Sequence, residues 1–168
     1  MFRNIIILFF SIVLICGCGG VYEYKVPEVQ DICITHKLPG TVSFTVSAEE
    51  CYHHDIGVNH YSIFVKDAVE KQCEKSLADT FEGGLVPKNG DVHIMITALN
   101  TSAFPITNII NDIRLFFRIE IFDKEMKLQK TAVLYGFGTA KDGNYALKFA
   151  VGNMYYQILP LLEELFIR

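Results

Sequence analysis

Alternation of apolar and polar residues predicts a β-hairpin early in the chain. Apolar side chains alternate strictly with threonine and serine over residues 42–47, and Ile32 and Ile34 also alternate with polar neighbours. The sequence Leu38-Pro39-Gly40 between these stretches is typical of a turn. We therefore expect two antiparallel strands with one solvated face. The polar residues 49–60 that follow predict a loop.

Residues 91–99, 112–122 and 128–139 predict three further strands. The pattern is clearest over residues 112–122, whose apolar side consists of Ile113, Leu115, Phe117, Ile119 and Ile121. The other side carries arginine and glutamate, although Phe116 and Phe122 interrupt it. Charged residues follow and favour a turn, so the last two strands are expected to form a hairpin.

The last predicted strand has two notable features. Val133, Tyr135 and Phe137 fall on one of its sides. Gly136 and Gly138 also lie within it, and glycine inside a strand indicates a bulge or the close approach of another backbone. Their spacing does not fit a phosphate-binding loop.

A period of three to four residues predicts two amphipathic helices. Over residues 61–81 the apolar stripe consists of Tyr61, Val65, Ala68, Val69, Cys73, Leu77 and Phe81. Gly83 and Gly84 then favour a helix end. Over residues 145–166 the stripe consists of Leu147, Val151, Met154, Ile158, Leu162 and Leu165. Pro160 is expected to kink or interrupt this second helix.

These elements follow the order β-β-α-β-β-β-α. The order predicts an α+β fold in which an antiparallel sheet of about four to five strands carries two long helices on one face. We expect residues 31–168 to form this single domain.

The first residues of the chain predict an export signal. Arg3 precedes an apolar run over residues 5–15, which is shorter than the roughly 20 residues needed to span a bilayer. The end of this run, Ile15-Cys16-Gly17 before Cys18, resembles the bacterial lipobox. Cys16 is the poorer acceptor, because bulky Ile15 precedes it where the signal peptidase accepts a small side chain. The alternative is an uncleaved N-terminal anchor.

The lipobox resemblance implies that residues 1–17 are a signal peptide and that Cys18 becomes the acylated first residue. Two or more acyl chains give stable membrane attachment without a spanning helix. Residues 18–30 are then expected to form a lipidated tether. Gly19, in place of the aspartate that favours inner-membrane retention in enteric bacteria, implies the periplasmic face of the outer membrane.

Composition narrows the classes of partner. Without residues 1–17, the chain keeps 151 residues with 14 basic and 19 acidic side chains, a net charge of −5. This charge and the lack of a basic block argue against nucleic acid as a partner. Cys33, Cys51 and Cys73 allow either one disulfide bond or three free thiols, and spacing does not choose between them.

The lipobox and the order of elements together resemble small envelope lipoproteins. These include the LPS-assembly lipoprotein family, the YajG-like lipoproteins and the auxiliary lipoproteins of ABC transporters. The resemblance implies a membrane-anchored accessory or assembly component of an envelope transport or surface-structure complex, with an envelope protein as its partner. The alternative is a carrier or sensor that holds an apolar ligand in a cleft between helices and sheet.

Candidate chemistry is sparse. His53, His54 and His60 lie close in sequence, but adjacent side chains on an extended segment point apart, whereas a metal site needs converging ligands. Cys51 beside His53 lacks a group that would orient the pair for catalysis, and His93 is expected to be a packed or surface residue. We expect no metal, no cofactor and no enzymatic activity.

The segment between the strands at 91–99 and 112–122 is unusually apolar for a connection. It contains Phe104, Pro105 and Ile106. Exposed apolar loops often mark contact surfaces, so these residues are a candidate docking loop. The alternative is that the segment folds back as extra core or as a bent strand.

Overall fold

The computed structural model of the chain describes residues 19–107 and 110–166. The predicted signal peptide and its acceptor Cys18 lie outside these residues, and so do the side chains of residues 104–107 and 110.

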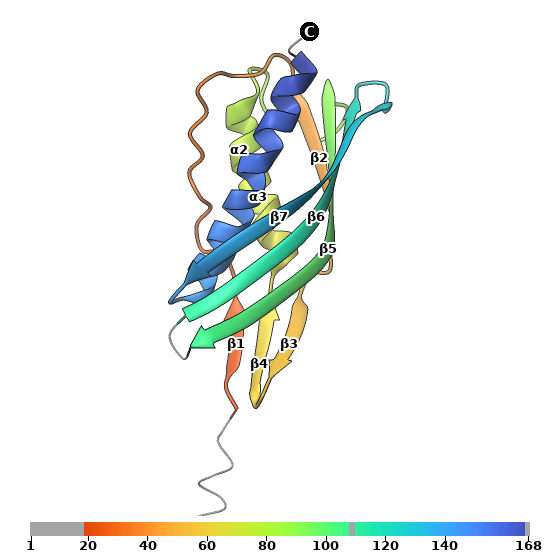
Figure 1. Cartoon of the computed structure of the whole chain (residues 1–168). Helices are drawn as coiled ribbons and strands as arrows, with labels where there is room; N and C mark the ends of the chain where they lie inside the picture. The colour runs from red at the N-terminus through yellow and green to blue at the C-terminus, as the bar shows by residue number, and fades with distance from the viewer. Residues whose placement is uncertain (1–18, 108–109, 167–168) are drawn as a thin grey trace, which may run out of the picture.

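Two helices and seven strands form the described part of the chain (Figure 1). The helices are α2 (Val65–Thr80) and α3 (Gly143–Phe166). The strands are β1 (Val21–Tyr24), β2 (Val42–Ser47), β3 (Tyr52–Ile56), β4 (Asn59–Ile63), β5 (Val92–Thr107), β6 (Ile110–Asp123) and β7 (Leu128–Ala140). The α+β class with two long helices is therefore confirmed.

The strands form two sheets. One has four strands in the order β2-β5-β6-β7, and the other has three in the order β1-β4-β3. Both helices lie on one face of the larger sheet (Figure 1). The smaller sheet, which includes β1, lies below the helices in this view.

The prediction of one antiparallel sheet of about four to five strands is wrong, because the described residues form seven strands in two mixed sheets. β2 pairs in parallel with β5, and β1 pairs in parallel with β4. Alternation identifies a strand without identifying its partner. The long connection from β2 to β5 contains α2, which is the kind of crossover that parallel neighbours require.

The predicted N-terminal hairpin is also wrong, because Ile32 and Ile34 lie outside any strand. Their segment is bound to α2 instead. The Gln30 amide donates to Gln72 Oε1 at 2.9 Å, and Gln72 Nε2 donates back to the Gln30 carbonyl at 2.9 Å. Lys75 on the same helix pairs with Asp31.

The predicted loop over residues 49–60 is a hairpin of β3 and β4. Gly57, at a φ of 62°, allows the turn between them. Since β4 continues to Ile63, α2 begins at Val65 and is four residues shorter at its start than predicted. The predicted apolar stripe is nevertheless buried throughout, because Tyr61 also points inward from β4.

The core lies between the larger sheet and the helices. All five inward residues predicted for β6 are at most 1% exposed. The predicted stripe of α3 is buried as far as Leu162, and Leu165 packs at its edge. Helix α3 continues through Pro160. Proline has no amide hydrogen, so the Tyr156 carbonyl lacks its helical donor at this position. Tyr156 and Pro160 are both exposed, and water can therefore donate a hydrogen bond to this carbonyl.

Glycines in β7 bring α3 unusually close to the sheet. A Cβ atom at Gly136 would lie 2.3 Å from the Ala150 carbonyl oxygen, and one at Gly138 would lie 2.0 Å from that of Ala146. The prediction that these glycines mark a close backbone approach is confirmed. No side chain, and therefore no ligand, fits between helix and strand at this contact.

Candidate functional site

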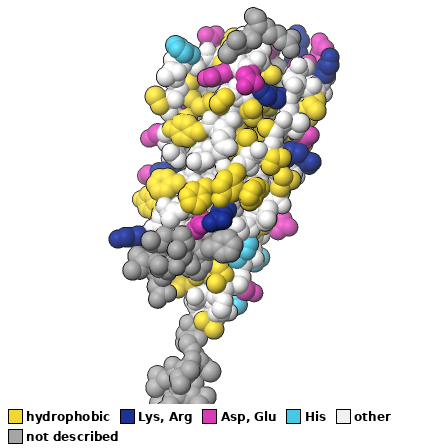
Figure 2. All heavy atoms as spheres, in the orientation of Figure 1, with side chains coloured by type: hydrophobic (Ala, Val, Ile, Leu, Met, Phe, Trp, Pro, Cys, Tyr) yellow, Lys and Arg dark blue, Asp and Glu magenta, His cyan; other side chains and the backbone are white. Residues whose placement is uncertain are grey.

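The outer face of the larger sheet, opposite the helices, carries a group of exposed apolar side chains. We call this group the outer apolar cluster; it consists of Leu99, Phe116, Val133 and Phe137, which are exposed, and the partly exposed Tyr135. The Phe116 and Tyr135 rings have centroids 4.8 Å apart, and those of Tyr135 and Phe137 are 6.4 Å apart. Hydrophobic side chains form a band across this side of the molecule (Figure 2).

Strand register explains how the cluster forms. Phe116 pairs with Tyr135 across the β6–β7 ladder, and Val133 and Phe137 lie two residues to either side of Tyr135 on the same face. Leu99 falls in a register shift between Ala98 and Asn100, next to the partner of Phe116. Val133 is 66% exposed. Leu134, Gly136 and Gly138 of β7 therefore face the core, and Val133, Tyr135 and Phe137 lie on its outer face.

Charged side chains flank the cluster along β6. Arg114 and Arg118 lie two residues to either side of Phe116. Arg114 Nη2 donates to buried Asp112 at 2.9 Å, and this hydrogen bond raises the pKa of the guanidinium. Arg118 lies 3.9 Å from Glu120. The cluster is thus an apolar strip with an ion pair near each end.

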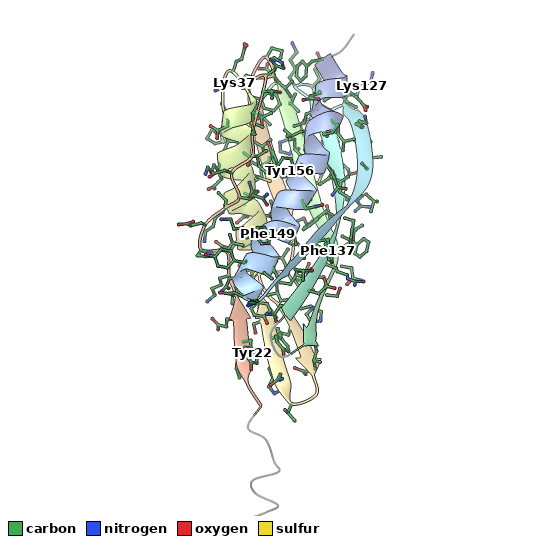
Figure 3. The ribbon with its side chains drawn as sticks, turned by 60° about the vertical axis from the view of Figure 1, so that its left-hand side comes forward. Tyr22, Lys37, Lys127, Phe137, Phe149 and Tyr156 are labelled. Carbon is green, nitrogen blue, oxygen red and sulfur yellow. The ribbon has the colours of Figure 1, made fainter. Side chains whose placement is uncertain are left out.

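Helix α3 exposes a second aromatic row, which consists of Tyr145, Phe149 and Tyr156. Figure 3 shows Phe149 and Tyr156 on the solvent side of α3, with Phe137 on neighbouring β7. The Tyr145 and Phe149 rings are 6.5 Å apart, but no ring contact joins Tyr156 to them among the described residues. This row is more scattered than the outer apolar cluster.

The predicted docking loop belongs to a strand. The backbone of Phe104 pairs with Asp112, and that of Pro105 pairs with Asn111. Residues 104–106 are therefore the end of β5, which agrees with the bent-strand alternative. Their side chains lie outside the described part of the chain, so a docking role for them stays a prediction.

The histidines near the β3–β4 hairpin do not converge. His53 Nδ1 lies 3.1 Å from Ser62 Oγ, and His60 Nδ1 lies 2.6 Å from Asp55 Oδ1. His54 lies on the opposite face of β3 from His53. Within residues 19–107 and 110–166, no three histidine, cysteine or acidic side chains are grouped to hold a metal. Cys51 lies near His53, with 4.0 Å between Sγ and Nδ1.

The remaining titratable candidates are structural. His93 lies between Ser43 and Thr45, with its Nδ1 2.9 Å from the serine oxygen, and partial burial lowers its pKa. Cys33, Cys51 and Cys73 are free thiols. Burial raises the pKa of the Cys73 thiol far above its ordinary value, which keeps it protonated and unreactive.

The start of the described chain is bound to the domain. Gly20 donates its amide to Asn59 Oδ1 at 2.9 Å and accepts the His60 amide at 2.9 Å. β1 then pairs with β4. Residues 18–30 are expected to form a loose tether, but residues 21–24 form this strand, and Lys25 and Gln30 are hydrogen-bonded to Asn144 and Gln72 of the helices.

A recess of about 320 Å³ opens at the opposite end of the domain. It is lined by Asp91, Val92, Phe122, Asp123, Gln129, Leu165 and Phe166. It lies between the start of β5 and the end of α3 and is open to solvent, unlike the enclosed cleft expected for a carrier of apolar ligands.

Comparison with known proteins supports the fold. The chain matches no family model, and no curated protein matches it in sequence. The structure is similar to that of protein XCC0632 from Xanthomonas campestris, of family DUF330, with a TM-score of 0.54 and 8% identity over 84% of this chain and 91% of that one.

Two further structures align over most of the chain. They are the hypothetical protein CT253 from Chlamydia trachomatis (TM-score 0.42, 10% identity, 86% and 95% of the two chains) and lipoprotein GNA1162 from Neisseria meningitidis (TM-score 0.39, 8% identity, 87% and 99%). These two TM-scores are too low to establish a shared fold, so only the similarity to the Xanthomonas protein supports the fold. Neither described helix has the length and apolar character needed to cross a membrane.

Proposed function

We propose that this chain is a lipid-anchored interaction protein of the bacterial envelope. Acyl chains on Cys18 would hold it at the periplasmic face of the outer membrane. Its folded domain would bind a protein partner as an accessory or assembly component of a transport or surface-structure complex. The proposal includes no enzymatic activity, metal or cofactor.

The outer apolar cluster is the observation that carries this proposal. Phe116, on the inner strand β6, is 38% exposed, and Phe137, on the edge strand β7, is 41% exposed. Exposed aromatic residues that contact one another, with arginine beside them, are typical of protein–protein contact sites.

The chemistry of the cluster suggests the kind of partner. Aromatic rings offer a surface for an apolar segment, and the ion pairs of Arg114 with Asp112 and of Arg118 with Glu120 place polar groups of both signs near its ends. We therefore expect a partner surface in which apolar residues are flanked by hydrogen-bonding polar residues. Rings already in contact with one another lose little conformational freedom on binding.

Affinity recovery after crosslinking in membranes tests the proposal. The variant Phe116→Ser with Phe137→Ser should lose the partner that the wild-type protein recovers. The matched control, Phe149→Ser with Tyr156→Ser, removes equally exposed rings from α3 and should retain it. Thermal unfolding and membrane fractionation of both variants verify that fold and anchoring are intact.

The result distinguishes several accounts. Loss of the partner only in the helix variant would move the contact surface to α3. Retention by both variants at normal stability would refute the docking role of the outer apolar cluster.

The end of β5 is a second place to test. If Phe104 and Ile106 contribute to docking, Phe104→Asp with Ile106→Asp should abolish partner recovery at unchanged stability, because charges are costly in a desolvated interface and cheap in water. A large fall in stability would instead show that these residues belong to the core.

A further inference from the structure

The first described residues lie at the tip of the β3–β4 hairpin. A Cβ atom at Gly19 would be 1.8 Å from the Val58 carbonyl oxygen, so the two backbones are in direct contact there. Val58 lies in the turn between β3 and β4. Cys18, the proposed acceptor, is bonded to Gly19. Consecutive Cα atoms are about 3.8 Å apart, so only one peptide unit separates the acceptor from the residue that contacts this tip.

The same end of the small sheet exposes apolar side chains. Val21 is 73% exposed and Val58 is 60% exposed, and Tyr22 is also exposed although its ring stacks on Tyr61 at 5.0 Å. Figure 3 shows Tyr22 on this narrow end, away from the helices. Val21 and Tyr22 are neighbours in a strand and point to opposite faces. The exposed apolar side chains are therefore grouped at the end of the small sheet and do not cover either of its faces.

We infer that this end, formed by Val21, Tyr22 and Val58, contacts the lipid surface directly and fixes the orientation of the domain on the membrane. The inference rests on the proposed acylation of Cys18. An acyl chain starting one residue from Val58 leaves no linker that could hold these side chains away from the bilayer. Transfer of the valine side chains from water to lipid is favourable in free energy, and tyrosine is enriched at the interface between lipid and water.

The tip carries no strongly basic side chain, because neither residues 19–24 nor residues 51–63 contain lysine or arginine. His60 Nδ1 lies 2.6 Å from Asp55 Oδ1. This end therefore offers no basic surface that would attract anionic lipids. We therefore expect the contact to be the same with zwitterionic and with anionic lipids.

Hydrogen bonds transmit the orientation of this end to the main domain. Tyr24, the last residue of β1, donates its hydroxyl to Asn111 Oδ1 at 2.7 Å. The next amide, that of Lys25, donates to Asn144 Oδ1 at 2.7 Å. Phe116, the β6 member of the outer apolar cluster, lies five residues farther along this strand, at about 3.3 Å per residue. It would thus be held at a fixed height above the lipid.

Tryptophan fluorescence tests the inference, since the chain contains no tryptophan. The mature protein with Val58→Trp is reconstituted into phosphatidylcholine vesicles that contain headgroup-proximal spin-labelled lipid. Val21→Trp provides a second probe in case the turn does not tolerate the first. Leu128→Trp, at an exposed position beside the β6–β7 turn at the far end of the domain, is the matched control.

We expect emission from residues 58 and 21 to shift to shorter wavelength and to be quenched by the labelled lipid. Emission from residue 128 should do neither, and added anionic lipid should leave the pattern unchanged. Vesicle flotation of the same samples distinguishes the two proposals. Protein that does not float contradicts the lipid anchor. Protein that floats with all three probes unquenched overturns the membrane contact while the anchor stands.

Discussion

Replacement of Phe117 tests the assignment of faces on β6. Phe117 is fully buried and pairs with Ala98 and Leu134 in the centre of the sheet. Truncation to alanine removes a buried ring and leaves a cavity, which costs about 3 to 5 kcal/mol. Domains of this kind have about 5 to 15 kcal/mol of stability in all, so a large share is lost. With a urea slope of about 2 kcal/mol/M, the midpoint should fall by about 2 M.

The neighbouring residues are the matched controls. Phe116→Ala removes a half-exposed ring and its contact with Tyr135, which is worth about 0.5 to 1.5 kcal/mol. Arg118→Ala breaks only an exposed pair with Glu120 and should have almost no effect. Urea unfolding followed by circular dichroism measures all three. Equal midpoint shifts for Phe117→Ala and Arg118→Ala would show that the faces are assigned wrongly.

Three further predictions concern the helices and pH. Gly138→Ala should destabilise the domain by about 1 to 3 kcal/mol, because its Cβ would collide with the Ala146 carbonyl, whereas Thr139→Ala on the outer face should be mild in the same urea assay. Gln72→Ala should cost about 1 to 3 kcal/mol by leaving the Gln30 backbone groups unpaired, and an equal effect of exposed Lys71→Ala would contradict this. Burial lowers the pKa of His93 below its ordinary 6.5, so the unfolded chain binds the proton more tightly than the folded chain does. The stability of the fold should therefore decrease as the pH drops below 6.5. Thermal unfolding at a series of pH values measures this decrease, which should be smaller for His93→Gln.

The sequence predicts β6 well because its pattern and its surroundings agree. Large apolar residues point to a thick core, and charged residues point to solvent. In β7 the same reasoning finds the strand but not its faces. The buried side there contains Gly136 and Gly138, since the α3 backbone leaves no room for larger residues, and the aromatic residues remain outside.

The strands of the small sheet escape prediction for a different reason. β3 and β4 carry histidine, aspartate and serine on an exposed face, and their burial depends on β1, which is distant in sequence. Gly19 and Gly20 suggest flexibility by composition, yet Gly19 is required for close packing against Val58. Strand pairing between segments far apart in the chain leaves no local signal, so the parallel neighbours could not be predicted.

The candidate site was only partly visible in the sequence. Phe116 interrupts the polar side of β6, which is a signal for an exposed contact residue. Its neighbours across the ladder depend on the register of β7, which the sequence alone does not determine.

Intact-mass measurement of the protein extracted from membranes is the decisive test of lipid anchoring at Cys18. We expect a mature chain that begins at Cys18 and carries a diacylglycerol thioether, with or without a third acyl chain on its amino group. Cys18→Ser should yield an unprocessed, unacylated precursor. A mature chain that begins at another residue, or one whose mass includes no acyl group, would show that the protein is not anchored through an acylated Cys18.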